Sequence, residues 1–118
     1  MSQQGKGQSR LERTFQSALA AHQSARLNEA SELYEQILRL DRRHFPALLL
    51  LGAVKAQQAD YAAAERLTRD ALRVQPRDLR ALLQHGNVLL AQQRYDDAFA
   101  AFGDAMAVNP SMPEVHVN

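Results

Sequence analysis

The sequence has no cysteine and no tryptophan, few other aromatic residues, and little valine or isoleucine. Without cysteine, disulfide bonds and thiolate zinc sites are excluded, and because such a chain suits a reducing compartment we expect a cytoplasmic protein. The scarcity of valine and isoleucine gives strands little support, whereas the helix formers Ala, Leu, Gln and Arg are abundant. We therefore predict an all-α fold for these 118 residues, a length that suits one domain with a packed core.

Long apolar runs and a large net charge are also missing. No stretch of about 20 apolar residues is present, so we expect no membrane-spanning segment, and polar residues 1–8 lack the apolar part of a secretory signal. The formal net charge of +1 argues against a dedicated nucleic-acid binder. The charges are unevenly placed, because all 14 basic residues lie within residues 1–94 and residues 95–118 carry acidic charges only.

The sequence matches itself at an offset of 34 residues, which indicates internal repeats. Three units follow without gaps, at 11–44, 45–78 and 79–112, and each has the period of two helices. The coinciding positions hold residues of similar size or turn-forming residues: Leu27, Tyr61 and Tyr95; Ala30, Ala64 and Ala98; Gly52 and Gly86; Pro76 and Pro110.

Helix-capping signals set the expected boundaries of the domain. Ser9 and Glu12 have the spacing of a capping box, so we predict that the first helix begins there, that residues 1–9 form a disordered tail, and that the repeat domain covers residues 10–118. Asp78 is placed to cap the helix that starts at Leu79. Residues 113–118 read as the start of a truncated fourth unit.

The repeat positions resemble the tetratricopeptide repeat, whose signature combines a Leu-Gly pair, a small Ala, an aromatic and a Pro at fixed spacings. The third unit gives Leu82-x2-His85-Gly86-x2-Leu89, then Ala98-x3-Phe102, then Pro110. The resemblance implies a right-handed superhelical solenoid of antiparallel helix pairs. Small residues are expected where two helices cross closely, because a larger side chain would separate them.

The resemblance also implies a function, that of a non-catalytic protein–protein interaction module. Such a module would bind a peptide or helix in the concave groove that the first helix of each pair lines. The partner is a protein that the sequence does not identify. The expected groove residues are Phe15, Leu19, Gln23, Leu49, Ala53, Ala56, Arg80, Leu83, Asn87 and Leu90.

No constellation of catalytic or metal-binding residues stands out, so we expect no enzymatic activity, cofactor or metal site in this segment. The histidines have no partner at metal-ligand spacing, and no catalytic triad or phosphate-binding loop is visible. His85 occupies a position that usually holds Leu in this family, and we predict that it packs between helices. The carboxylates at Glu29, Glu32, Glu35, Asp96 and Asp97 have the positions of solvated helix residues.

Two other functions stay open. The array could be the N-terminal recruiting region of a larger enzyme, such as a glycosyltransferase or sulfotransferase. This alternative rests on a partial resemblance to repeat arrays of O-linked N-acetylglucosamine transferases, which carry Asn where this chain has Gln16, Leu50, Gln84 and Asn118. The other rests on a basic stripe that consists of Arg66, Arg69, Arg73, Arg77 and Arg80. This stripe could be a solvated face, a surface for an acidic partner or for the chain's own acidic C-terminal unit, or a nucleic-acid site.

The last apolar residues of the array lack a following helix pair to cover them. We therefore expect the exposed C-terminal end to form a homodimer through a self-complementary apolar patch. The residues expected to contribute are Phe99, Phe102, Met106, Val108 and Met112.

Overall fold

The computed structural model describes residues 3–109, with side chains from residue 9 onward. This part of the chain forms six helices and no strand. The helices are α1 (Gln3–Gln23), α2 (Leu27–Leu40), α3 (Phe45–Gln57), α4 (Tyr61–Val74), α5 (Leu79–Ala91) and α6 (Tyr95–Val108). The predicted all-α class is confirmed. Residues 113–118, expected to open a fourth unit, lie outside the described residues.

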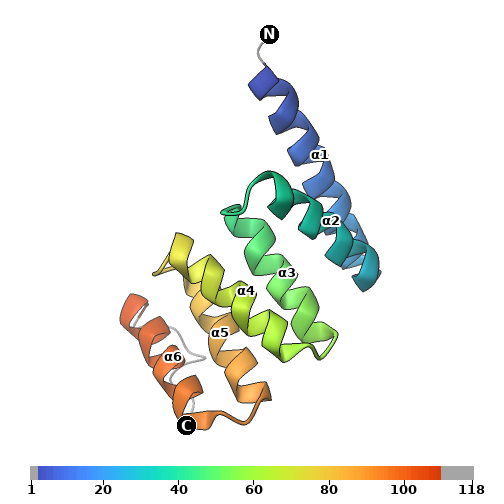
Figure 1. Cartoon of the computed structure of the whole chain (residues 1–118). Coiled ribbons are helices and arrows are strands. Elements are labelled where there is room, and N and C mark those ends of the chain that lie inside the picture. The colour runs from blue at the N-terminus through green and yellow to red at the C-terminus, as the bar shows by residue number, and fades with distance from the viewer. Residues whose placement is uncertain (1–2, 110–118) are drawn as a thin grey trace.

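The helices stack as three antiparallel pairs in an elongated array of 53 × 28 × 21 Å. Figure 1 shows the pairs following one another, with α1–α2 at one end and α5–α6 at the other. Each helix packs mainly against its neighbours in the chain, and α3 also contacts α5. Contacts restricted to neighbouring units are the hallmark of a solenoid. None of these six helices is long and apolar enough to cross a membrane.

The start of α1 differs from the prediction, because the helix already begins at Gln3 rather than near Ser9. Residues 3–9 therefore extend the first helix and do not form a separate tail. Gly5 and Gly7 disfavour a helix in this segment, but Gln and Lys tolerate one well, and lengthening an existing helix needs no new nucleus. The capping-box spacing at Ser9 and Glu12 was thus a misleading signal. Whether the domain and repeat boundaries lie where they were drawn stays a prediction, although α3 and α5 begin at the first residues of the second and third units.

Small residues lie at the helix crossings, as the repeat pattern predicted. Ala30, Ala64 and Ala98 are at most 2% exposed, and both repeat glycines are buried. A Cβ atom added at Gly52 would lie only 2.7 Å from Nε2 of Gln84. A side chain at this position would therefore force the Gln84 amide out of its place between the helices.

The turn inside each pair repeats the same backbone geometry. Ala25, Ala59 and Gln93 all have positive φ, at 60°, 62° and 61°, and they are spaced 34 residues apart. After each of them, the next residue donates a backbone hydrogen bond across the end of the preceding helix; Asp60 N donates to Lys55 O at 2.8 Å. This is the Schellman arrangement, which normally uses glycine at the left-handed position.

Side-chain caps fix the starts of the middle helices. The carboxylate of Asp78 accepts from Ala81 N at 3.1 Å, which confirms the predicted cap of α5. Asp60 caps α4 by accepting from Ala63 N at 3.3 Å. His44 caps α3 through Nδ1, which accepts from Ala47 N at 3.1 Å. Each cap satisfies a backbone N–H that has no partner within its own helix.

Candidate functional site

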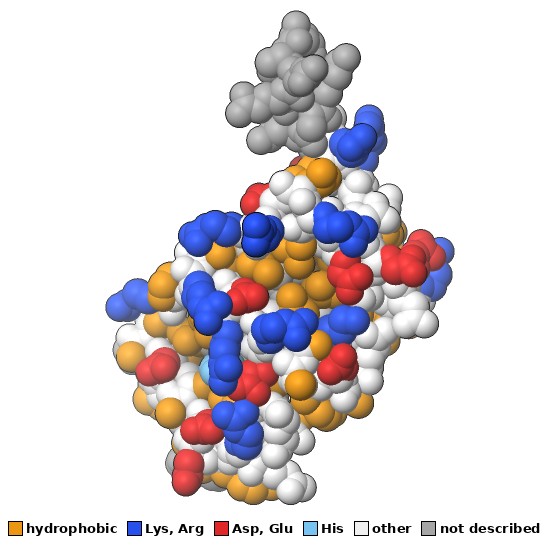
Figure 2. Space-filling view, viewed as in Figure 1, with side chains coloured by type: hydrophobic (Ala, Val, Ile, Leu, Met, Phe, Trp, Pro, Cys, Tyr) orange, Lys and Arg blue, Asp and Glu red, His pale blue; other side chains and the backbone are white. Residues whose placement is uncertain are grey.

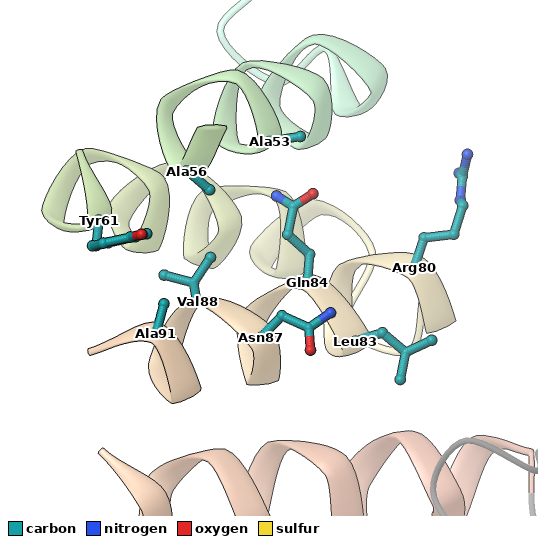
Figure 3. Close-up of a pocket in the computed structure, with 9 residues that line it drawn as sticks. All are labelled: Ala53, Ala56, Tyr61, Arg80, Leu83, Gln84, Asn87, Val88 and Ala91. Carbon is teal, nitrogen blue, oxygen red and sulfur yellow. The ribbon is translucent and has the colours of Figure 1, made fainter. Parts of the chain in front are cut away.

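A hollow of about 380 Å³ lies between α3 and α5, beside the start of α4. We call it the α3–α5 hollow. Figure 3 shows Ala56 on α3 directed toward α5, with Gln84 and Val88 directed from α5 toward α3, and Ala53 one turn earlier on α3. The remaining lining residues are Tyr61, Arg80, Leu83, Asn87 and Ala91.

Small side chains make this hollow possible. Ala53 and Ala56 leave space on the surface of α3 that larger residues would fill, and Ala91 does the same near the end of α5. Leu83, Val88 and the ring of Tyr61 add apolar surface to the walls. A mostly apolar concavity with a few polar groups is the usual form of a ligand site.

Gln84 joins three helices at the base of the hollow. Its amide Nε2 donates to Leu49 O on α3 at 3.0 Å and to Thr68 Oγ1 on α4 at 2.9 Å. The amide nitrogen is therefore committed to holding the second and third helix pairs together. The sequence comparison had placed Gln84 only in a ladder of groove amides, and the hydrogen bonds give it a structural role.

Arg80 stands at the mouth of the hollow. Its guanidinium lies 3.4 Å from Oδ2 of Asp78 and 5.7 Å from the centroid of the Phe45 ring, a cation–π arrangement. In Figure 3 the side chain extends away from the other lining residues. Because it is exposed, the guanidinium can still pair with an anionic group on a bound segment.

The structure brings together only part of the predicted groove set. Ala53, Ala56, Arg80, Leu83 and Asn87 line the α3–α5 hollow. Two of the others do not: Leu49 is 4% exposed and belongs to the core, and Leu90 is 46% exposed and does not line the hollow. Leu49 is buried because α3 is covered by α2, α4 and α5 together, which leaves little of its surface free.

The groove residues predicted on α1 lie elsewhere along the array. The ring of Phe15 packs with Tyr34 and His44 at centroid distances of 6.2 and 5.5 Å. Leu19 is half-buried and Gln23 is exposed. Between α1 and α3, Nε2 of His22 lies 2.8 Å from Oε1 of Gln57, so a hydrogen bond ties these two helices together.

A buried carboxylate was not expected from the sequence. Glu65 on α4 is 7% exposed, and its Oε1 accepts from Arg94 at 2.8 Å and Gln92 at 3.1 Å while its Oε2 pairs with Arg69. Burial alone would raise the pKa of Glu65, but these hydrogen bonds and the positive charges of Arg69 and Arg94 outweigh it and hold the pKa below its ordinary value. The sequence did contain one indication of this burial: Glu65 lies four residues after Tyr61 and one after Ala64, close to the face of the helix that packs against its neighbours.

His85 lies beside this network and packs between helices, in line with the prediction. Its Nδ1 atom is buried and has no hydrogen-bond partner among the described residues. Burial, with the positive charges of Arg69 and Arg94, lowers the pKa of His85, although Glu65 and Asp104 act in the opposite sense. The lowered pKa of His85 favours the neutral imidazole. No three His, Asp or Glu side chains in residues 9–109 gather in a way that could hold a metal ion.

The basic stripe is partly neutralised. Arg69, Arg73 and Arg80 pair with Glu65, Asp70 and Asp78, whereas Arg66 and Arg77 have no carboxylate partner in the described chain. Figure 2 shows Lys and Arg side chains spread over the face that α2 and α4 present, with Asp and Glu among them.

Comparison with known proteins identifies the fold. No family model and no curated protein matches the sequence. The solved tetratricopeptide-repeat domain of Arabidopsis OM64 is 19% identical with a TM-score of 0.86, over 93% of this chain and 91% of that one. The Yersinia enterocolitica type III secretion chaperone SycD, solved with a peptide of the translocator YopD, is 19% identical with a TM-score of 0.84, over 92% and 82% of the two chains.

A third similar structure is part of an enzyme. The Thermobaculum terrenum O-GlcNAc transferase is 21% identical with a TM-score of 0.85, and the match covers 93% of this chain but only 21% of that protein. These identities are low, whereas the helix arrangements agree over nearly the whole chain. The chain therefore has the fold of tetratricopeptide-repeat domains, a superhelical solenoid of antiparallel helix pairs.

Proposed function

We propose that this chain is a non-catalytic interaction module that binds a helix or an extended segment of a partner protein over the α3–α5 hollow. The observation that carries the proposal is the apolar concavity formed by Ala53, Ala56, Leu83 and Val88, with exposed Arg80 and Asn87 beside it. An apolar side chain inserted there would gain about 1.5–3 kcal/mol from burial.

The polar residues beside the hollow would set the orientation of the bound segment. The Asn87 amide can both donate to and accept from a peptide backbone. Arg80 can pair with a carboxylate of the ligand. SycD, a protein of the same fold, was solved with a peptide bound, which supports a peptide-binding use of this architecture. A cytoplasmic location, expected from the lack of cysteine, stays part of the same proposal.

The test of this function uses a site-specific photo-crosslinker. A photoreactive phenylalanine derivative placed at Leu83 should crosslink a partner from the native cell extract, and the same group at Leu90 should not, because Leu90 lies on α5 outside the hollow. The variant Leu83→Glu should lose capture while Leu90→Glu keeps it, with equal helical circular dichroism for both. Equal crosslinking at the two positions would contradict a site in the α3–α5 hollow.

The second candidate is the recruiting region of a larger enzyme. It is favoured by the likeness to the O-GlcNAc transferase, of which the matched array is about a fifth. In that case the hollow would hold a protein substrate of the attached catalytic domain. The coding sequence around this segment distinguishes the two functions, because a recruiting region of an enzyme requires a catalytic domain in the same reading frame.

Self-association through the C-terminal end is a further part of the proposal. Tyr95 and Phe99 are 54% and 75% exposed, and they lie on one side of α6. Phe102, Met106 and Val108 are half-buried instead, because Phe102 packs against Leu89 and Ala98 and Val108 packs near Leu82. Met112 lies outside the described residues. The apolar patch available to a second copy therefore centres on Tyr95 and Phe99.

A further inference from the structure

A second hollow, of about 630 Å³, lies among α2, α3 and α4. Its floor is apolar and consists of Leu38, Leu51 and Leu67. Four basic side chains surround this floor: Arg39, Arg42, Lys55 and Arg66. Glu35 completes the lining, and we call these eight residues the basic groove. In Figure 2, hydrophobic side chains show through in the middle of the viewed face, with Lys and Arg side chains around them.

The basic groove and the α3–α5 hollow use different sides of α3. Leu51 and Lys55 belong to the groove, and Ala53 and Ala56 belong to the hollow. Residues two positions apart on a helix are rotated by about 200° around its axis, so Ala53 points away from both Leu51 and Lys55. The two sites share no lining residue, and a ligand in one leaves the other open.

Three of the four cations of the basic groove lack the carboxylate partners that five arginines elsewhere have. Arg39, Arg42 and Arg66 make no ion pair with any carboxylate in the described chain, and all three are exposed. Lys55 has only Glu35, with Nζ 3.9 Å from Oε2. By contrast, five arginines elsewhere pair with nearby carboxylates: Arg26, Arg69, Arg73, Arg80 and Arg94. The groove thus holds four cations against one carboxylate.

The lining specifies what kind of anion would fit. Guanidinium groups bind carboxylates through paired hydrogen bonds, while the floor offers buried area to a large apolar side chain. The groove contains no aromatic ring, and single-stranded nucleic acids depend on such rings for base stacking. The near-neutral net charge of the chain also gives little general attraction for a polyanion.

We propose that the basic groove is a second interaction surface, which binds an acidic segment of a partner protein with a large apolar side chain between its carboxylates. The apolar side chain lies on Leu38 and Leu67, and the carboxylates pair with Arg39, Arg42 and Arg66. This surface is independent of the proposed function of the α3–α5 hollow, because it lies on the other side of α3.

The probe is a fluorescein-labelled peptide of about 12 residues, rich in Asp and Glu with two central Leu residues, followed by anisotropy in about 150 mM salt. The unaltered chain should bind it with a Kd in the micromolar range. The triple variant Arg39→Gln/Arg42→Gln/Arg66→Gln should bind at least about tenfold more weakly. A matched control, Arg10→Gln/Arg13→Gln/Arg77→Gln, removes the same charge from exposed positions outside the groove and should change the Kd by less than about twofold.

Two further peptides test separately the contributions of the carboxylates and of the apolar side chains to binding. A counterpart with Asn and Gln in place of Asp and Glu should not bind, and one with Ser in place of Leu should bind at least about fivefold more weakly. The proposal is overturned if the control triple variant loses as much affinity as the groove variant, or if all three peptides bind equally. An oligonucleotide that binds more tightly than the acidic peptide would also overturn it.

Light scattering on the same variants tests whether a second copy of this chain occupies the groove instead of a partner protein. If the unaltered chain forms dimers that the groove variant abolishes, the groove is occupied by the acidic helix α6 of a second copy, and the proposed partner segment is wrong. A chain that binds the peptide supports the proposal if it is monomeric, or if its dimers persist in the groove variant. Since the three arginines are exposed and unpaired, the groove variant should keep the thermal stability of the unaltered chain.

Discussion

The ring of Phe102 on α6 covers Gly86 on α5 so closely that a Cβ atom added to the glycine would lie 2.5 Å from Cε1 of the ring. The two helices of the third pair therefore cross with no space for a methyl group between them. The glycine is required here by the close approach of an aromatic ring, since the backbone of Gly86 is ordinary helix.

The first prediction follows from this contact. Gly86→Ala should lower the free energy of unfolding by about 1–2 kcal/mol, because the gain in helix propensity is smaller than the overpacking against Phe102. Thermal denaturation measures the effect. Gly103→Ala is the control, because nothing lies within 4 Å of its Cβ position, and this change should stabilise the chain by about 0.5–1 kcal/mol. Equal melting temperatures for the two variants would contradict the crossing described here.

A second prediction concerns the left-handed residues of the turns. Ala59→Gly should stabilise the chain by about 1 kcal/mol, because alanine is strained at a φ of 62° and glycine is not. Ala20→Gly, at an exposed position inside α1, should instead destabilise it by about 0.5–1 kcal/mol. Urea denaturation of both variants gives the signs, and a loss of stability in Ala59→Gly would show that the strain is absent.

The third prediction is a pH dependence that arises from His85. Its pKa is lowered in the folded chain by burial, whereas the unfolded chain takes up a proton at about pH 6.5. The unfolded state therefore binds more protons below that pH, and stability falls as the pH drops from 7 toward 5.5. His85→Leu and His85→Gln should both reduce this fall, because neither side chain titrates. Melting temperatures with the same pH slope in all three proteins would rule out the mechanism.

The fourth prediction tests the C-terminal patch. At about 100 µM the chain should contain dimers by light scattering, and Phe99→Ser should weaken them, because Phe99 is the most exposed of the large hydrophobic residues described. Leu40→Ser removes a side chain that is 56% exposed at the end of α2 and should leave the dimer intact. A monomer at this concentration, with Phe99 in place, would refute self-association through α6.

Residues whose role depends on the repeat were predictable from the sequence. The 34-residue offset identified Ala30, Ala64 and Ala98 as crossing positions without any knowledge of their neighbours, because a repeated size restriction reflects a repeated contact. The cap by Asp78 was predictable for a similar reason, since it depends only on the residues that follow it.

Residues whose role depends on one particular neighbour were not predictable in this way. Leu49 and Leu83 occupy equivalent positions in the second and third units, yet Leu49 is buried because α3 has helices on three sides, and Leu83 lies in the hollow. Glu65 has no charged counterpart at position 31 or 99, where Ser and Phe stand. Its partners Arg94 and Gln92 come from the next unit, so no pattern within one repeat could indicate the network.

The neighbour-only packing of the array has a consequence for local opening. The main packing partner of α6 is α5, so α6 can separate while α1–α5 keep most of their mutual contacts, and its amide hydrogens should exchange with solvent sooner than those of α3. A segment bound between α3 and α5 would raise the opening free energy of those two helices and leave α6 nearly unchanged. Hydrogen exchange would therefore reveal a ligand in the α3–α5 hollow. Amide protection would increase in α3 and α5 but not in α6, with the sharpest change at the boundary between α5 and α6.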